Sequence, residues 1–304
     1  MNPLFVFALF IFSLTAQQRA LCESFIIVDN RSGQILAASN EKKKVQVASL
    51  TKIATASVIL DMVEMGRIAL SDLVTINALA MRAGGANPVG LQEGDQVTVR
   101  DLLYCSLLAS DNIAATALAH YAGARIPNPE RLPPVANFVS HMNALARLLG
   151  MKRTLFLNPT GMDGGEGAQP YSTAADLARL TRHVYQEADI PYYVSQASRE
   201  IKVLRDGQEL AYAINNTNVL LGKLHIDGVK TGQTSRSGGC LILSSELPPE
   251  VSRQGDVTYV TPRRIHVVLL GSRDRFSRGM ELTRLGWQLY KSWARSGRKL
   301  NKPL

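Results

Sequence analysis

SLTKIATASVILDMVEMG, residues 49–66, is the stretch of the chain that sets the fold. Apolar side chains recur in it at helical spacing from Ile53 through Leu60 to Val63, and Gly66 follows as a stop signal. Because apolar residues occupy several faces of this helix, we predict that it is buried. A chain of 304 residues that is 46% hydrophobic can bury one large core, or two modest ones, around it.

Short apolar runs on both sides of this helix predict strands. Residues 25–28 and 35–38 flank the turn-forming segment 29–33, which is the pattern of a hairpin. Residues 239–244 and 265–271 repeat the strand pattern near the other end of the chain. Strands at both ends with helices between them predict that the two ends of the domain meet in one sheet.

The middle of the chain is predicted to be mainly helical. Helical patterns cover residues 99–123, 135–149 and 173–186, and polar residues 110–112 interrupt the apolar pattern of the first segment. Pro-rich or Gly-rich connections separate these segments.

A long connection and a final helix follow in the C-terminal part. Residues 246–262 are too many for a tight turn, so they form either an inserted loop or an extended hairpin. The pattern of residues 280–293 indicates a helix on which Leu282, Leu285 and Leu289 form an apolar stripe. We expect this helix to pack on the sheet, with a membrane-surface helix as the alternative.

Bulk composition narrows the classes of function. The net charge of +9 suits an acidic polymer, a membrane surface or nucleic acid as neighbour, but no nucleic-acid motif accompanies it. We therefore predict no nucleic-acid partner, and both a carboxylate-bearing wall polymer and a merely soluble basic surface stay open. Cys22, Cys105 and Cys240 lie far apart, and the five histidines show no ligand spacing, so we predict neither a metal nor a cofactor.

The N-terminal apolar run, residues 4–14, reads as a secretory signal because no acidic residue precedes Glu23. The run is shorter than the roughly 20 residues that a membrane-spanning helix needs. We predict a signal peptide at residues 1–20, whose cleavage point stays open, and a periplasmic or otherwise extracytoplasmic location. Leu21 is too large for the small residue that normally precedes a lipidated cysteine, so we do not predict lipidation of Cys22. We do not predict membrane association of the exported protein either.

The first chemical motif is S-x-x-K at Ser49 and Lys52. Residues 39–42 and 296–299 have the same spacing, but only Ser49 begins a buried helix, on which Lys52 shares its face. A lysine near its reference pKa of about 10.4 holds its proton at neutral pH. Burial, and a second cation such as Lys230, would lower that pKa and let the lysine activate the serine.

Two further motifs suit the same chemistry. Ser110 and Asn112 form the only S-x-N, in which a hydroxyl can relay a proton and a carboxamide can bind a substrate backbone. Lys230, Thr231 and Gly232 form the only K-T-G, which on a strand edge offers a charge, a hydroxyl and room for close approach. Each motif alone is weak, but the three together in this order are typical of penicillin-binding proteins and β-lactamases.

With these motifs the chain resembles the low-molecular-mass penicillin-binding proteins, the D-alanyl-D-alanine carboxypeptidase family of serine peptidases. The resemblance extends over residues 24–290 and includes GLQEGD at 90–95, VTVRDLLY at 97–104, NPTGMD at 158–163, YST at 171–173, NTN at 216–218 and DGVKTGQT at 227–234. It implies an α/β (α+β) fold of the serine β-lactamase and penicillin-binding transpeptidase type. In that fold an antiparallel sheet is flanked by helices, and the site lies between the sheet and an all-α subdomain.

The resemblance also assigns roles to the matching positions. Ser49 attacks the peptide carbonyl and is acylated, and Lys52 takes its proton. Ser110 helps pass that proton to the departing D-alanine. Asn112 holds the donor peptide, and Lys230 supplies positive charge.

The remaining expected roles concern the substrate's ends. Thr231, next to Gly232, helps bind the terminal carboxylate, and the backbone N–H groups of Ser49 and Gln233 form the oxyanion hole. Gln233 stands where many relatives carry His, which is tolerable if the backbone does this work. Arg275 matches a family arginine that recognises the carboxylate, with an ordinary exposed arginine as the alternative.

We therefore predict a D,D-peptidase domain over residues 21–295 with a basic tail at 296–304. Its expected activity is that of a serine-type D-Ala-D-Ala carboxypeptidase on peptidoglycan pentapeptides, with β-lactams as covalent inhibitors. A D,D-endopeptidase that cuts cross-linked peptides would use the same residues and stays open. A class A β-lactamase would need a glutamate in an E-x-x-L-N setting, and none has one. Retention of nucleophile and base argues against an inactive wall-binding protein.

Overall fold

The structure, a computed structural model, describes residues 23–164, 167–186 and 189–304, so the predicted signal peptide lies outside the described residues. A five-stranded antiparallel sheet has the strand order β2-β1-β9-β8-β7. Its strands are β1 (Ser24–Asp29), β2 (Ile35–Ser39), β7 (Ile226–Thr234), β8 (Gly238–Gln254) and β9 (Val257–Ser272). Strands from the two ends of the domain are neighbours in this sheet, as predicted.

The sheet is buried on both faces because its apolar side chains alternate in direction. On β1, Ile26 and Val28 belong to the large core shared with the helices, whereas Ile27 belongs to a smaller core on the opposite face. On β8, Ile242 and Leu241 divide in the same way. Each strand therefore contributes to two cores.

The last helix, α8 (Arg275–Arg295), covers the smaller core and packs on the sheet, as expected. It begins five residues earlier than the predicted range of 280–293. The predicted stripe is partly wrong, because Leu285 is 36% exposed. The buried face runs instead through Leu282, Gly286 and Trp287, where the glycine lets the helix lie close to the sheet.

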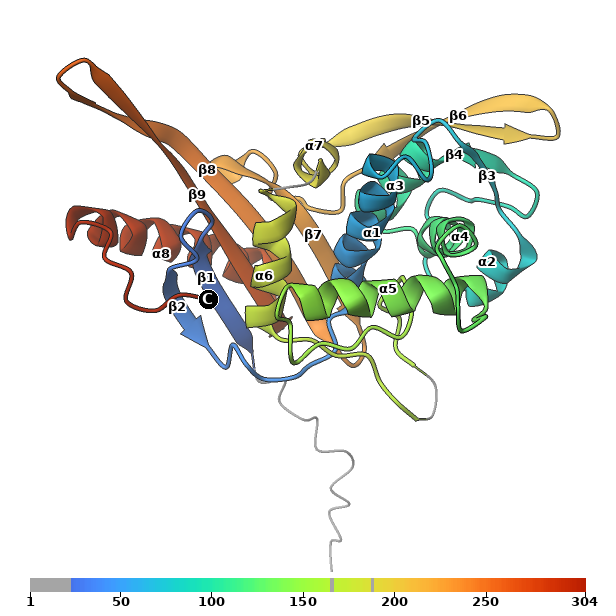
Figure 1. The fold of residues 1–304 in the computed structure, drawn as a ribbon, viewed down its shortest axis with the longest axis horizontal. Coiled ribbons are helices and arrows are strands. Elements are labelled where there is room, and N and C mark those ends of the chain that lie inside the picture. Colours follow the sequence, from blue (N-terminus) through green and yellow to red (C-terminus); the bar gives the residue numbers. More distant parts are fainter. Residues whose placement is uncertain (1–22, 165–166, 187–188) are drawn as a thin grey trace, which may run out of the picture.

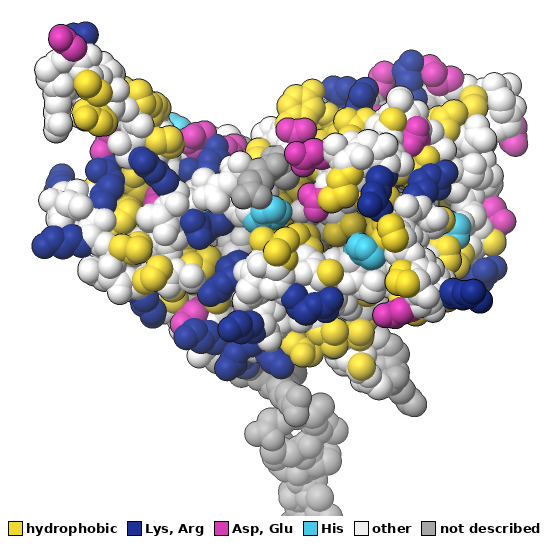
Figure 2. All heavy atoms as spheres, in the orientation of Figure 1, with side chains coloured by type: hydrophobic (Ala, Val, Ile, Leu, Met, Phe, Trp, Pro, Cys, Tyr) yellow, Lys and Arg dark blue, Asp and Glu magenta, His cyan; other side chains and the backbone are white. Residues whose placement is uncertain are grey.

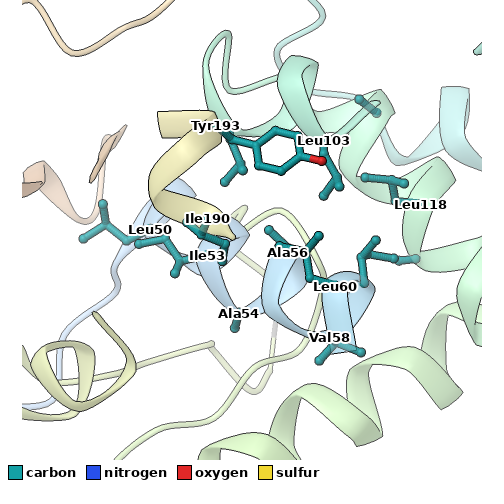
Figure 3. Packing of buried hydrophobic residues seen from close by; sticks show 14 of the residues in the cluster. Leu50, Ile53, Ala54, Ala56, Val58, Leu60, Leu103, Leu118, Ile190 and Tyr193 are labelled. Carbon is teal, nitrogen blue, oxygen red and sulfur yellow. The ribbon is translucent and has the colours of Figure 1, made fainter. Parts of the chain in front are cut away.

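Helices lie on the other side of the sheet. They are α1 (Lys52–Glu64), α2 (Ala78–Ala83), α3 (Val99–Leu107), α4 (Asn112–Gly123), α5 (Pro134–Leu148), α6 (Ala174–Val184) and α7 (Ile190–Val194). Of these, α6 and α7 contact the strands of the sheet, and the rest pack on one another. A 3-10 turn, η1 (Ala48–Thr51), leads into α1, whose residues 52–60 are all buried. Figure 3 shows side chains of α1 enclosed by neighbouring helices, so the prediction of a buried central helix is confirmed.

The predicted helix over residues 99–123 is wrong as a single element, because α3 and α4 are separate helices. Ser110 adopts a left-handed backbone conformation with φ of 62°, which no α-helix tolerates in its interior. The Asp111 carboxylate then accepts a hydrogen bond from the backbone N–H of Ala114 at 2.9 Å and caps the start of α4. The polar interruption in the sequence is therefore a helix boundary.

A second antiparallel sheet, of four strands, lies beside α3 and α4 and was not predicted. Its order is β3-β4-β5-β6, from β3 (Leu73–Thr75), β4 (Gln96–Thr98), β5 (Ser198–Arg205) and β6 (Gln208–Asn215). The helical part of the molecule thus carries strands as well.

Residues 246–262 form the extended hairpin that was one of the two expected alternatives. Figure 1 shows β8 and β9 running on beyond the rest of the sheet into this projection. Over residues 23–164, 167–186 and 189–304, no helix has the length and apolar character needed to cross a membrane.

Candidate active site

Lys52 is the point at which three distant segments meet. Its ammonium nitrogen Nζ lies 2.9 Å from Ser49 Oγ, 2.6 Å from Asn112 Oδ1 and 3.1 Å from the carbonyl oxygen of Thr160. Ser49 and Lys52 share a face because they are three residues apart across η1 and the first turn of α1. The predicted approach of the lysine to the serine is confirmed.

Burial controls the charge of this lysine. Lys52 is fully buried, and the loss of solvation lowers its pKa from its usual value to about 7, against the opposing effect of the Asp111 carboxylate. A lysine with that pKa is partly neutral at neutral pH and can accept the proton of Ser49. Burial is the largest cause of this depression, as expected.

Lys230, the second lysine of the site, also has a depressed pKa. The pKa of Lys230 lies well below its usual value because the side chain is buried, and because Lys52 and Arg275 are close enough to disfavour its charge. Its Nζ donates to the carbonyl oxygen of Thr231 at 3.2 Å. Lys230 therefore lies on β7 within electrostatic reach of the serine–lysine pair.

Strand β7, at the edge of the five-stranded sheet, lies directly against the nucleophile. A Cβ atom placed on Gly232 would lie 3.0 Å from the backbone nitrogen of Ser49 and 3.1 Å from Ala48 Cβ. A side chain there would crowd η1, so the glycine of K-T-G lets β7 lie close to the segment that carries Ser49.

Thr231 is joined to a residue that the motif analysis did not single out. The hydroxyl oxygens of Thr231 and Thr217 lie 2.7 Å apart, and Thr217 also donates from its hydroxyl and its backbone N–H to the carbonyl oxygen of Leu108. Thr217 thus links β7 to the end of α3. Its only sequence signal was the NTN block at residues 216–218 of the family resemblance.

The S-x-N residues lie on the boundary between α3 and α4. Asn112, the first residue of α4, is buried and bonds Lys52, while its backbone N–H donates to Ala86 at 2.8 Å. Ser110 is half-buried. In the described part of the chain no hydrogen bond joins its hydroxyl to Ser49, Lys52 or Lys230, so the structure brings Ser110 near the site without a direct link.

Arg275 and Gln233 meet at the outer end of β7. Gln233 is exposed, and its side-chain oxygen accepts a hydrogen bond from the guanidinium of Arg275, the first residue of α8. Arg275 is half-buried, and its charge reaches Lys230. Arg275 therefore borders the same strand as the other candidate residues.

The loop before α6 supplies further contacts that sequence reasoning missed. Asn158 Oδ1 accepts hydrogen bonds from the backbone N–H groups of Thr160 and Gly161, which shapes the turn. Thr55 of α1 donates to the carbonyl oxygen of Pro159 at 2.7 Å. The NPTGMD block at 158–163 was visible in the resemblance, but its use of a backbone carbonyl to hold Lys52 was not.

Among the residues that the structure describes, no three His, Cys, Asp or Glu side chains lie together as a metal site requires. Cys105 and Cys240 are free and buried. The groups gathered around Ser49 that offer chemistry are a hydroxyl, two ammonium groups, a carboxamide and backbone amides.

A serine hydroxyl bonded to a buried lysine of depressed pKa, with a second lysine on the adjoining strand, defines a serine acyl-transfer enzyme of the Ser–Lys type. The family model described as D-alanyl-D-alanine carboxypeptidase, Peptidase S11, matches residues 13–248. The chain belongs to this family.

Curated relatives agree with this assignment. The chain is 31% identical to the D-alanyl-D-alanine carboxypeptidase DacF of Bacillus subtilis, with 74% of this chain and 54% of the relative covered. It is also 31% identical to DacC of Escherichia coli, with 88% and 62% covered. A D-alanyl-D-alanine endopeptidase of Pseudomonas aeruginosa is 30% identical, with 77% and 70% covered. The chain thus spans little more than half the length of these two carboxypeptidases.

Solved structures confirm the predicted fold class. A mutant of the Streptomyces K15 DD-transpeptidase superposes with a TM-score of 0.73 at 27% identity, covering 87% of this chain and 97% of the other. DacD of Francisella tularensis gives 0.68 at 26% identity, covering 89% and 70%. Ampicillin-bound penicillin-binding protein D2 of Listeria monocytogenes gives 0.64 at 24% identity, covering 87% and 96%, and supports the fold alone.

Proposed function

We propose that the protein is a serine-type D-Ala-D-Ala carboxypeptidase that acts through an acyl-enzyme on Ser49. The observation that carries this proposal is the distance of 2.9 Å between Ser49 Oγ and Lys52 Nζ, in a lysine whose pKa is about 7. A neutral amine at hydrogen-bonding distance is what a serine needs in order to lose its proton as it attacks.

The reaction then runs in two halves. Lys52 takes the proton of Ser49 as Oγ bonds to the carbonyl carbon of the penultimate D-alanine. The C–N bond to the terminal D-alanine breaks, and Ser110 helps return the proton to the departing amine. Water hydrolyses the ester and restores Ser49. Backbone N–H groups of Ser49 and Gln233 stabilise the oxyanion in both halves.

Substrate recognition falls to residues along β7 and at the start of α4. Asn112 binds the substrate backbone, and Lys230 supplies positive charge near the terminal carboxylate. Thr231, beside the open backbone of Gly232, and Arg275 bind that carboxylate. Their support is their common position around Ser49, with Gly232 packed against it and Arg275 at the outer end of the same strand.

Covalent labelling by a fluorescent penicillin tests this proposal. The wild-type protein should be labelled, because a β-lactam carbonyl acylates the same serine, and the label should leave slowly, since no deacylating glutamate is placed in the β-lactamase setting. Ser49→Ala should abolish the label while leaving the unfolding temperature unchanged. Labelling that persists in Ser49→Ala would refute the nucleophile.

A D,D-endopeptidase is the second candidate, because a D-alanyl-D-alanine endopeptidase of Pseudomonas aeruginosa is 30% identical over 77% of this chain. The leaving group would be the side-chain amine of a cross-link in place of free D-alanine. Incubation with a monomeric pentapeptide and with a cross-linked dimer separates the two. Release of D-alanine from the pentapeptide supports the carboxypeptidase, whereas cleavage of the dimer alone supports the endopeptidase.

We further propose that the chain is exported by a signal at residues 1–20 and works outside the cytoplasm as one D,D-peptidase domain over residues 21–295, with a basic tail at 296–304. Fractionation of cells that express the full chain tests the location. Recovery of the protein in the cytoplasm with Met1 intact would contradict it.

A further inference from the structure

A group of basic side chains lies on three segments that the structure brings together. We define the basic surface as Lys42, Lys43, Lys44, Lys152, Arg153 and Arg179, of which the first five are exposed and Arg179 is half-buried. The segment that joins β2 to α1 runs along the lower edge in Figure 1, and Figure 2 shows Lys and Arg side chains gathered along that edge.

Hydrogen bonds make these segments one surface. The guanidinium of Arg153 donates to the carbonyl oxygen of Lys42 at 3.2 Å, and its backbone N–H donates to the Asp176 carboxylate at 2.8 Å. The backbone N–H of Ala175 donates to the carbonyl oxygen of Glu41 at 2.9 Å. The three segments that carry the six cations are therefore held together by hydrogen bonds, each of which uses a backbone group.

Positive charge is in excess on this surface. Segments 41–44, 152–153 and 174–179 carry the six basic residues against two acidic ones, Glu41 and Asp176. Within the described part of the chain, Arg179 is the one member of the basic surface that forms an ion pair, with Asp176 at 4.0 Å. A cluster of exposed cations that outnumber their counter-charges attracts a polyanion over about a Debye length, roughly 8 Å at physiological salt.

The basic surface lies close along the chain to the proposed active site. Lys44 precedes Ser49 by five residues, and a chain of that length spans at most about 18 Å. Gln46 bonds Gln169 at 3.0 Å, and the carbonyl oxygen of Val47 would lie 3.3 Å from a Cβ on Gly232. The segment that bears the lysines thus borders the strand proposed to bind the substrate.

We infer that the basic surface binds neighbouring carboxylate-bearing peptides of a polymeric wall substrate while one peptide end occupies the site at Ser49. This inference rests on the proposed function and adds a second binding surface for the wall polymer, outside the site at Ser49. A single pentapeptide fills the site at Ser49, whereas a polymer presents further carboxylates at the spacing of its peptides. Several weak ion pairs made at once raise affinity for the polymer through effective concentration.

An anionic membrane fits the basic surface less well. Binding in the plane of a bilayer combines cations with apolar side chains that enter the headgroup region. Segments 41–44, 152–153 and 174–179 expose no large hydrophobic side chain.

The test compares two triple variants of equal charge change in the full-length protein. Lys42→Ser/Lys43→Ser/Lys152→Ser removes three exposed cations of the basic surface. Lys291→Ser/Arg295→Ser/Lys299→Ser removes three exposed cations near the end of α8. Each is assayed for D-alanine release from a soluble pentapeptide and from uncross-linked pentapeptide-bearing peptidoglycan, at low and at high salt.

The first variant should lose about tenfold in rate on the polymer, equivalent to about 1.4 kcal/mol, and keep its rate on the pentapeptide. High salt should remove most of the difference. The control variant should match the wild type on both substrates. Equal losses in the two variants, equal losses on the two substrates, or no loss on the polymer would each overturn the inference.

Two further measurements distinguish failure of this inference from failure of the proposed function. If the wild type releases D-alanine from neither substrate, the proposed function fails. Co-sedimentation of each variant with the polymer then still tests the basic surface, since its binding does not need turnover. Binding to vesicles with anionic lipids that is lost in the first variant, with polymer binding unchanged, would replace the wall polymer with a membrane and overturn the inference.

Discussion

The charge on Lys52 sets the pH at which Ser49 reacts. Lys52 must be neutral to accept a proton, and its pKa is about 7, so acylation should fall as the pH drops through that value. The Asp111 carboxylate opposes the depression by favouring the charged lysine. Asp111→Asn keeps a side chain that can cap α4 but removes the charge, so the pKa of Lys52 should fall further and the acidic limb should move to lower pH.

The rate of acylation by a fluorescent penicillin, measured from pH 5 to 9, checks this shift. Asp101→Asn is the matched control, because Asp101 lies in α3 and Asp111 is the acidic group that shifts the pKa of Lys52. An acidic limb that stays in place in Asp111→Asn, or that moves to higher pH, would show that the lysine is not the base.

Thr217 should tune how Thr231 presents its hydroxyl to the substrate. When Thr217 donates to Leu108, Thr231 must donate to Thr217, and when Thr217 donates to Thr231, the second hydroxyl is free to donate to a carboxylate. Thr217→Val removes the hydroxyl that makes both arrangements and leaves the Thr231 hydroxyl without its hydrogen-bond partner. The KM for the pentapeptide should rise about fivefold, equivalent to about 1 kcal/mol, with kcat little changed. Thr217→Ser keeps the hydroxyl and should restore the wild-type KM; a loss equal to that of Val would assign the effect to packing.

At the scale of elements, the sequence predicts strongly periodic segments well and interrupted ones poorly. The buried helix α1 follows from its apolar repeat alone. The predicted helix over residues 99–123 is interrupted at Ser110 and Asp111, although apolar residues continue on both sides. The left-handed backbone of Ser110 and the capping carboxylate of Asp111 depend on local conformation, which apolar periodicity does not reveal. Strands β5 and β6 were missed although residues 210–214 form a short apolar run, because a run of that length does not distinguish a strand from a helix segment.

The same limit explains which parts of the site were missed. Side-chain type and spacing were enough to identify Ser49, Lys52, Asn112 and the K-T-G residues in the sequence. Thr160 contributes a backbone carbonyl, which every residue has, so the type of its side chain gives no signal in the sequence. Its position depends on the turn of residues 158–161, which becomes meaningful only once the fold brings it to η1.

Gly161 should be the residue that lets this turn reach η1. It has a φ of +78°, and a Cβ there would lie 1.8 Å from the carbonyl oxygen of Ala48. Gly161→Ala should cost about 3 kcal/mol or more of the free energy of unfolding, because steric overlap adds to the left-handed strain, and should slow acylation. Gly66→Ala has the same strain, at φ +66°, with nothing within 4 Å, and should cost about 1 kcal/mol without slowing acylation. Denaturant unfolding measures both; equal costs would show that the turn shifts freely.

For the whole molecule, the predicted meeting of the two chain ends determines where the site can form. β1 pairs with β9, and β7 reaches the edge only because β8 and β9 fill the space between. The alternation on these strands puts helices on one face and α8 on the other. Residues 49, 112 and 230 therefore meet through long-range contacts. The spacing of the motifs along the chain does not show that these residues lie close together in space. That expectation came from the family resemblance.

The projecting hairpin is the part of this architecture that the chemistry should not need. Val251, Val257, Tyr259 and Val260 near its tip are between 49% and 66% exposed. The ion pairs that hold the hairpin to the rest of the molecule end at Glu250. Its carboxylate pairs with Arg263 and with Arg298, which lies after α8. Removing the hairpin beyond that residue should leave the sheet intact.

Replacement of residues 251–260 by Asn-Gly tests this division. Glu250 and Thr261 are paired across the hairpin four residues before Gln254 and Val257, which close the present turn, so both pairs share one hydrogen-bonding pattern and suit a two-residue loop. The free energy of unfolding should change by less than about 1 kcal/mol, since the removed side chains are exposed. Penicillin acylation should proceed at the wild-type rate, because no contact joins the tip to Ser49. Slower acylation at unchanged stability would mean that the tip takes part in the reaction, whereas a large loss of stability would mean that the strands need their full length to pair.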